Sequence, residues 1–387
     1  MTMLFGQSAL NGSNGSNGSN GSNGSNGSNG SNAANGSNSF AGYSGWMSNP
    51  LLAFGLNLSR ENTVRPAETT PSNIAGFVPS GAWTGSGDLP PSNRESYLRR
   101  WDETTRFHLL YPEMLSGLEF QGGASGDVTL LCRSRNRAQP TLLRLVRPPR
   151  KTFEAQLQKV FDRCRERADR SAEILTQVVP QYAYWASICN LHPARTPWTI
   201  ELTTAALHFS MLVCQRIKHV LACPRPVEYT PLIQPMLLTP TYSAFPSGHA
   251  TEAYMFAFMM QAVLQGAGQG VAYDATRMQL LRVAKRIADN RVVAGLHFPI
   301  DAVGGYVLAS VLAGHLLARA EGGAAAGGTL DGRLIPMSWD DSDPCVVLNP
   351  ETELGKSWTP GKGIEVPPSA LLQYMLKRAR AEFSYAE

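Results

Sequence analysis

The stretch Pro246-Ser247-Gly248-His249 opens an apolar segment that predicts a helix from Ser247 to about Gln265. Serine is a favoured N-cap residue, and glycine lets the backbone approach a ligand closely. The free amides of the first turn and the helix dipole favour a bound oxyanion there. His249 is then placed to donate a proton to a leaving oxygen. A simple N-cap beside an exposed histidine explains the same four residues equally well, so the neighbouring motifs decide the interpretation.

Downstream, Arg291, His297 and Asp301 form a second group. An aspartate four residues after a histidine can hold one ring proton and leave the other nitrogen free as a nucleophile. Arg291 supplies parallel donors for two oxygens of a tetrahedral anion. Taken alone, a histidine packed beside a helix start with a capping aspartate accounts for the pair just as well.

Upstream, Lys218 lies near the end of an expected helix, and Arg225-Pro226 lies in the loop after it. Both cations can converge on one anion, although ordinary surface charge explains this spacing when it is taken alone. Three fixed cations, two histidines, a hydroxyl and a glycine amide together suit a tetrahedral oxyanion and phosphoryl transfer to an imidazole. The three groups therefore predict an enzyme that binds phosphate or an isostere of phosphate.

Apolar residues recur at helical spacing on both sides of these motifs. The pattern predicts helices over 150–185 (one or two), 197–222, 247–265, 274–290, 299–321 and 368–386. Segments 127–132 and 140–146 predict a short hairpin, and 345–348 is strand-like. We therefore expect an all-α fold, a helical bundle with a minor β-hairpin.

Composition divides the chain into four segments. Residues 11–31 repeat Asn-Gly-Ser, which has nothing apolar to bury, and predict a low-complexity, largely disordered N-terminal arm over 1–100. We expect a small irregular or β segment over 101–149 packed on the core. A helical catalytic core over 150–321 follows, and then a linker and C-terminal extension over 322–387.

The overall composition argues against several classes of protein. The formal charge of the 387-residue chain is +4 and its basic residues are scattered, so we expect no nucleic-acid partner. Six cysteines without paired spacing favour neither a zinc site nor a disulfide framework. The N-terminus lacks the basic start and apolar run of a secretory signal, and the apolar stretches 253–273 and 302–318 are polar-interrupted or short. We expect a soluble, cytoplasmic protein with no integral membrane span.

Taken together and in order, the three motifs resemble those of the type 2 phosphatidic acid phosphatase and vanadium-dependent haloperoxidase superfamily. That family reads Lys-x6-Arg-Pro, then Pro-Ser-Gly-His, then Arg-x5-His-x3-Asp, and each motif matches here without a gap. The resemblance covers about residues 150–320 and implies an α-helical bundle. One departure is that Asn290 stands where a serine often precedes the arginine of the third motif, which puts the contact of that hydroxyl in doubt.

The resemblance implies a role for each matching residue. His297 would attack phosphorus to form a phosphohistidine, or would bind vanadium directly as the metal ligand. Asp301 would orient His297, and His249 would protonate the leaving group and then activate water. The residues that would hold the phosphate or vanadate oxygens are Lys218, Arg225, Ser247, Gly248 and Arg291.

The resemblance leaves two reactions open. The first is a phosphoric monoester hydrolase without a cofactor, acid phosphatase-like, acting on a small phosphorylated substrate or a lipid phosphate. The second is a haloperoxidase that uses vanadate, hydrogen peroxide and a halide. The 22 residues from Arg225 to Ser247 make a compact core that favours the phosphatase. Tyr242, seven residues before His249, favours the haloperoxidase, because that family places an aromatic residue or a histidine beside the cofactor. A third interpretation is a non-catalytic phosphate-binding scaffold.

Overall fold

The computed structural model describes residues 54–55, 58–60, 95–123, 126–178, 181–265, 271–339 and 343–383. The chain forms two compact units, residues 1–102 and 103–387. In the first unit, the described residues include the 3-10 helix η3 (Glu95–Arg100). Apart from residues 54–55 and 58–60, the rest of the predicted disordered arm lies outside the described residues. All three motifs belong to the second unit.

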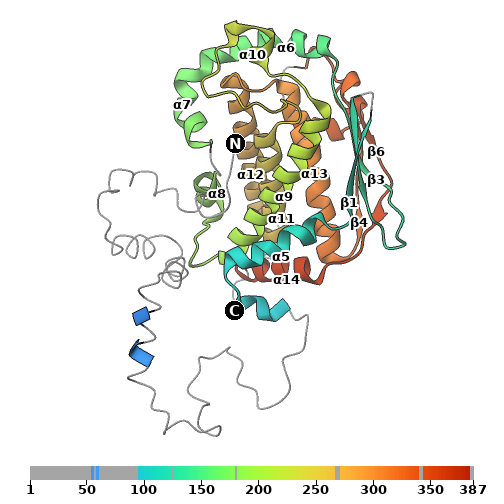
Figure 1. The fold of residues 1–387 in the computed structure, drawn as a ribbon. Helices are drawn as coiled ribbons and strands as arrows, with labels where there is room; N and C mark the ends of the chain where they lie inside the picture. Colours follow the sequence, from blue (N-terminus) through green and yellow to red (C-terminus); the bar gives the residue numbers. More distant parts are fainter. Residues whose placement is uncertain are drawn as a thin grey trace, which may run out of the picture. The chain divides into compact units, whose positions relative to one another are not determined.

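The second unit is built mainly of helices, with α11 packed against α9, α12 and α13 at its centre (Figure 1). α14 packs on α9 and α13, and α5 packs on α9. The α-helices are α5 (Glu103–Leu115), α6 (Arg150–Arg163), α7 (Arg167–Thr176), α8 (Tyr182–Cys189), α9 (Pro197–Leu221), α10 (Pro226–Tyr229), α11 (Gly248–Leu264), α12 (Val271–Val293), α13 (Pro299–Glu321) and α14 (Ala370–Ala381). The 3-10 helices are η4 (Cys164–Glu166), η5 (Pro231–Ile233), η6 (Gly332–Leu334), η7 (Pro344–Leu348) and η8 (Gly355–Ser357).

The central helices begin where short-range signals place them. Pro197 and Pro299 occupy the first turns of α9 and α13, where a missing N–H costs nothing. Ser247 caps α11, because its side chain accepts a hydrogen bond from the amide of Ala250. The predicted helices over 197–222, 247–265 and 299–321 are therefore confirmed to within one residue at each end.

α13 is buried on nearly all sides, as expected for a helix that is apolar all round. Among the described residues it is the one helix long and apolar enough to cross a membrane by length and composition. Of its most apolar stretch, 83% is buried inside the protein, as in the core helix of a bundle.

The protein is mostly helical, as predicted, but its sheet is larger than the predicted minor hairpin. β1 (Leu118–Gly123), β2 (Asp127–Cys132) and β3 (Thr141–Val146) pair antiparallel, as a hairpin prediction requires. β3 then pairs in parallel with β5 (Gly328–Asp331), and β5 pairs antiparallel with β6 (Trp358–Pro360), which completes a five-stranded mixed sheet. β4 (Ala324–Ala325) and β7 (Ile364–Glu365) form a second, two-stranded sheet.

The larger sheet forms because β5 and β6, from the C-terminal part of the chain, pair onto the edge of β1 to β3. The inner strands β2 and β3 are mostly buried and need covering on both edges, which β5 provides at the β3 edge. The strand-like stretch 345–348 is wrong as a strand, because it lies in the 3-10 helix η7. Asp343 caps η7 by accepting a hydrogen bond from the amide of Cys345.

Two glycines let α13 approach the start of α11. A Cβ built on Gly305 would lie 2.7 Å from the Cβ of Ala250 and 2.9 Å from the carbonyl oxygen of Ser247. A Cβ on Gly304 would lie 2.6 Å from the ring of Phe245. All three distances are too short for contacts between non-bonded atoms. The absence of side chains at these two positions therefore allows the Pro-Ser-Gly-His turn to lie directly on the first turns of α13.

Gly305→Ala is therefore expected to lower the free energy of unfolding by about 1–3 kcal/mol, as overpacking in a close-packed core does. Chemical denaturation measures the change. Gly314→Ala on the same helix is the matched control, because a Cβ there meets no atom within 4 Å. That control is expected to be neutral or to stabilise by up to about 1 kcal/mol through helix propensity. Equal effects at the two positions would contradict the close approach.

Candidate functional site

Three helices and two loops place the predicted site residues around the start of α11. Lys218 lies in the last turn of α9, and Arg225 precedes α10. Arg291 lies in the last turn of α12, and His297 and Asp301 flank the start of α13. Hydrogen bonds among these residues and their neighbours connect the five segments. Motifs that are far apart in the sequence therefore meet in one region of the second unit.

The three cations of the site are buried, with exposed fractions of 1% for Lys218, 2% for Arg225 and 1% for Arg291. Burial lowers the pKa of each one, to about 8 for Lys218 and to about 10 for Arg291. A buried cation is expensive unless it is paired or hydrogen-bonded. No carboxylate forms an ion pair with any of the three within the described part of the chain. The site is therefore a concentration of positive charge.

Backbone carbonyl groups hold Lys218 and Arg225. The Nζ of Lys218 donates to the carbonyl oxygens of Ser243 (2.6 Å) and Ala244 (3.0 Å). The Nε of Arg225 donates to the carbonyl oxygen of Tyr242 (3.0 Å). The ring of Tyr242 lies 5.3 Å from the Nζ of Lys218 and 5.2 Å from the Cζ of Arg225, within range of cation–π attraction. The loop before the Pro-Ser-Gly-His turn thus orients two cations of the site.

Two of the side-chain nitrogens of Arg291 make no hydrogen bond to the described residues. Its Nη2 donates to the carbonyl oxygen of Ile174 (3.0 Å) and to the Oε1 of Gln177 (3.2 Å). Its Nε and Nη1 are buried and have no hydrogen-bond partner among the described residues. A buried donor without a partner costs about 1–3 kcal/mol, and a charged one costs more. This pair of free donors suits a bidentate hydrogen bond to an oxyanion.

Hydrogen bonds on both ring nitrogens hold His297 between the carboxylate of Asp301 and the guanidinium of Arg225. Its Nδ1 lies 2.9 Å from the Oδ2 of Asp301, which also accepts the amide of Phe298 (2.9 Å). Its Nε2 lies 2.9 Å from the Nη1 of Arg225. Because guanidinium only donates and the carboxylate accepts, these partners assign the proton of a neutral ring to Nδ1. Nε2 then carries a lone pair on the side of the cations.

The pKa of His297 supports the neutral form. Burial lowers this pKa well below the ordinary value, and the charges of Arg225 and Lys218 lower it further. Burial also raises the pKa of Asp301 to about 7, although the hydrogen bond from Phe298 and the nearby cations oppose this shift. A neutral imidazole with an unprotonated Nε2 is the nucleophilic form of histidine, and in this structure Arg225 donates a hydrogen bond to that nitrogen.

The start of α11 contributes Ser247, Gly248 and His249. The side-chain oxygen of Ser247 accepts the amide of Ala250 (3.3 Å), so the hydroxyl proton is available to an anion. A Cβ built on Gly248 would meet only one atom within 4 Å, the Oε1 of Glu252 at 3.9 Å. No other side chain therefore crowds the Cα of Gly248, at the helix start where amides favour an anion.

His249 is oriented by the end of α7. Its Nε2 lies 3.0 Å from the carbonyl oxygen of Gln177, so Nε2 carries a proton and Nδ1 is the nitrogen that remains for other partners. Burial lowers the pKa of His249 to about 3, and the charge of Arg291 adds to this shift. An anion bound among the same cations would oppose the shift.

Gln177 is the site residue that the sequence motifs do not contain. It is 1% exposed, and its Oε1 accepts hydrogen bonds from Arg291 Nη2 (3.2 Å) and Asn290 Nδ2 (2.9 Å). Its carbonyl oxygen holds His249. Asn290, which departs from the family pattern, also donates to Glu173 Oε2 (2.9 Å). These two hydrogen bonds orient the Asn290 amide, and that amide in turn holds the Oε1 of Gln177 in place. A glutamine just beyond an amphipathic helix gives no sequence signal for such a role.

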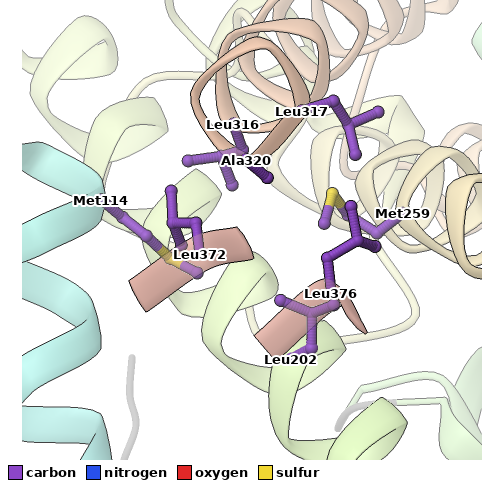
Figure 2. A pocket seen from close by; sticks show the side chains of 8 residues that line it. All are labelled: Met114, Leu202, Met259, Leu316, Leu317, Ala320, Leu372 and Leu376. Atoms are coloured by element: carbon purple, nitrogen blue, oxygen red, sulfur yellow. The ribbon is translucent and has the colours of Figure 1, made fainter. Parts of the chain in front are cut away.

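A separate apolar cavity lies away from these residues (Figure 2). Its lining includes Leu316, Leu317 and Ala320, at the far end of α13 from Asp301. Leu316 follows Asp301 by 15 positions, which correspond to about 22 Å along a helix. The cavity is lined by aliphatic side chains and methionines only, so it holds no group of the charged site.

Comparison with protein-family models matches residues 201–321 to the PAP2 superfamily. This segment runs from α9 through α13 and includes Lys218, Arg225, the Pro-Ser-Gly-His turn, Arg291, His297 and Asp301. Gln177 lies outside it. A search of curated proteins finds no match.

Proposed function

Since residues 201–321 match the PAP2 superfamily, we propose that the protein is a phosphoric monoester hydrolase that works through a phosphohistidine on His297. One observation carries the proposal. Two buried donors of Arg291, which have no partner among the residues that the structure describes, and the Nε2 lone pair of His297 belong to the same cationic region. Spare donors suit the phosphoryl oxygens, and the lone pair suits attack on phosphorus.

In the proposed first step, the Nε2 of His297 attacks phosphorus, and the P–N bond forms as the ester P–O bond breaks. Arg225 now donates to this Nε2, so the substrate must draw the guanidinium onto its own oxygens before attack. The leaving oxygen takes a proton from His249. Asp301 holds the Nδ1 proton of His297 throughout and stabilises the positive charge that develops on the ring.

In the second step, water attacks the phosphohistidine, the P–N bond breaks and phosphate leaves. His249 accepts a proton from the attacking water, which returns both histidines to their starting forms. For the first step His249 must carry a second proton, on Nδ1, because Nε2–H is held by Gln177. The dianionic substrate supplies the field that raises the pKa of His249 from about 3.

A single side-by-side assay tests the proposal. The purified protein is expected to hydrolyse p-nitrophenyl phosphate or a short-chain phosphatidate, with inorganic vanadate as an inhibitor that mimics the transition state. Absence of hydrolysis, together with bromination of a dione in the presence of vanadate, peroxide and bromide, would reverse the assignment. Absence of both activities would leave phosphate binding alone, as in a scaffold.

The haloperoxidase is the second candidate, favoured by the position of Tyr242 over Lys218 and Arg225. The site fits vanadate, because the unpartnered donors of Arg291 and the open space beside Gly248 suit its oxygens as they suit those of phosphate. The Nε2 of His297 would bind the vanadium, and the cations and the amides of α11 would bind its oxygens. When bound, vanadate would supply the activation of peroxide.

Gln177→Leu tests the residue that lies outside the matched family segment. It removes the acceptor for Arg291 and Asn290 but leaves the backbone carbonyl that holds His249. We expect kcat/KM for p-nitrophenyl phosphate to fall about 10- to 100-fold through misplacement of Arg291. The same change in an Arg291→Met background is expected to have little further effect. Additive losses in the double variant would show that Gln177 does not act through Arg291.

A further inference from the structure

Glu252 is a carboxylate beside the proposed phosphate site that the mechanism above does not use. It lies on α11 one turn after Gly248, and its side chain turns back toward the helix start, with Oε1 3.9 Å from the position of a Cβ on Gly248. The residue is partly buried. Its carboxylate has no hydrogen bond or ion pair to any residue in the described part of the chain. An unpaired acid at an anion site needs a physical explanation.

The groups around Glu252 come from the elements packed on α11. α9 presents Cys214 and Lys218, and the loop before α11 presents Tyr242, whose pKa Glu252 raises. Lys218 favours the ionised form of Glu252, but its ammonium already donates to two carbonyl oxygens. The other charged groups of the site on packed elements are Arg225, Arg291 and Asp301.

A tetrahedral anion at the amides of Gly248 would lie close to this carboxylate. Two negative charges in one partly buried place repel each other, whereas a protonated carboxyl donates a hydrogen bond to an anionic oxygen. Even without a ligand, burial raises the pKa of Glu252 to about 7, which places protonation within the physiological range. Binding of an anion can only raise this pKa further.

We propose that Glu252 binds the oxyanion as a neutral carboxylic acid, so that anion binding above neutral pH takes up one proton. The inference rests on the proposed function, because it assumes that an oxyanion sits at the start of α11. Glu252 is then a further binding residue of the site. It favours anion binding below about pH 7 and weakens anion binding above that pH.

The sign of the pH dependence follows from linkage. Below about pH 7 the carboxyl of Glu252 is already protonated in the free protein, so the affinity for an anion does not depend on this group. Above that pH the carboxyl must first gain a proton, and the Kd rises about tenfold per pH unit. Lys218 and Asp301 also titrate in this range, with pKa values of about 8 and about 7, so a variant is needed to isolate Glu252.

Calorimetric titration with sulfate tests the proposal, because sulfate stays a dianion across the range and brings no titration of its own. The Kd is measured from pH 5.5 to 8.5, in two buffers of different ionisation enthalpy that together count the protons taken up. For the full-length wild-type protein we expect Glu252 to take up about one proton per sulfate above neutral pH, in addition to any proton that His249 or Lys218 takes up. For Glu252→Gln we expect about one proton fewer per sulfate than for wild type, and we expect sulfate to bind about tenfold more tightly than to wild type at pH 8.

The controls separate this inference from the proposed function. Glu252→Asp keeps a titratable group and is expected to retain the proton uptake, and Glu351→Gln, at an exposed position, is expected to behave as wild type. Equal proton uptake in wild type and Glu252→Gln would overturn the role of Glu252 while leaving the oxyanion site intact. A wild-type protein that binds neither sulfate nor phosphate at any pH would overturn the proposed function and the inference with it.

Discussion

His297→Ala is expected to abolish hydrolysis of phosphate esters, with a fall in kcat on the order of 10^4- to 10^6-fold, as for removal of other enzymatic nucleophiles. The substitution removes the only protein atom that bonds to phosphorus in the proposed mechanism. Steady-state kinetics with p-nitrophenyl phosphate measure the loss. Rapid quenching at alkaline pH, where a phosphohistidine survives, is expected to trap a phosphoenzyme in the wild type and none in the variant.

A second buried histidine supplies the control for this variant. His315 lies near the other end of α13, is 2% exposed, and has no hydrogen-bond partner for either ring nitrogen among the described residues. His315→Gln is expected to keep full activity, because the change lies far from the reacting atoms. If His297→Ala retained more than about 1% of wild-type kcat, the nucleophile would have to be another group, with His249 the first to examine.

Arg291→Met is expected to lower kcat/KM about 10^2- to 10^3-fold, the usual result of removing one donor that stabilises developing negative charge. The structure adds a second expectation. Because Nε and Nη1 are buried without partners in the described part of the chain, we expect the free protein to be at least as stable after the charge is removed. Kinetics and chemical denaturation of the same preparation measure both quantities.

Arg291→Lys refines this test. Lysine restores a positive charge but not the paired, planar donors of a guanidinium, so only part of the lost activity should return. A large loss of stability with little loss of activity in Arg291→Met would mean that the arginine supports the packing of α12 rather than a bound anion. Loss of activity with unchanged or increased stability would identify it as a binding group.

The helical core could be predicted from sequence because its signals are short-range. Pro197, Ser247 and Pro299 each mark a helix start within a few residues, and the apolar repeat between them follows the helical period. The sheet could be predicted only in part. A hairpin joins neighbouring segments, but the pairing of β3 with β5 joins residues nearly two hundred positions apart, and no local pattern encodes that register.

The sequence by itself identified the chemical groups of the candidate site, which are the cations Lys218, Arg225 and Arg291 and the imidazoles of His249 and His297. These could be read because the motifs keep their residue types at constant spacing.

Tertiary structure alone decided the partners of these groups. It placed Gln177 between His249 and Arg291 and set Arg225 against the Nε2 of His297. It also left Glu252, near the start of α11, without a partner among the described residues. The physical reason is that a hydrogen bond or a pKa shift depends on distance and burial in the folded protein, and residues far apart in the chain supply both.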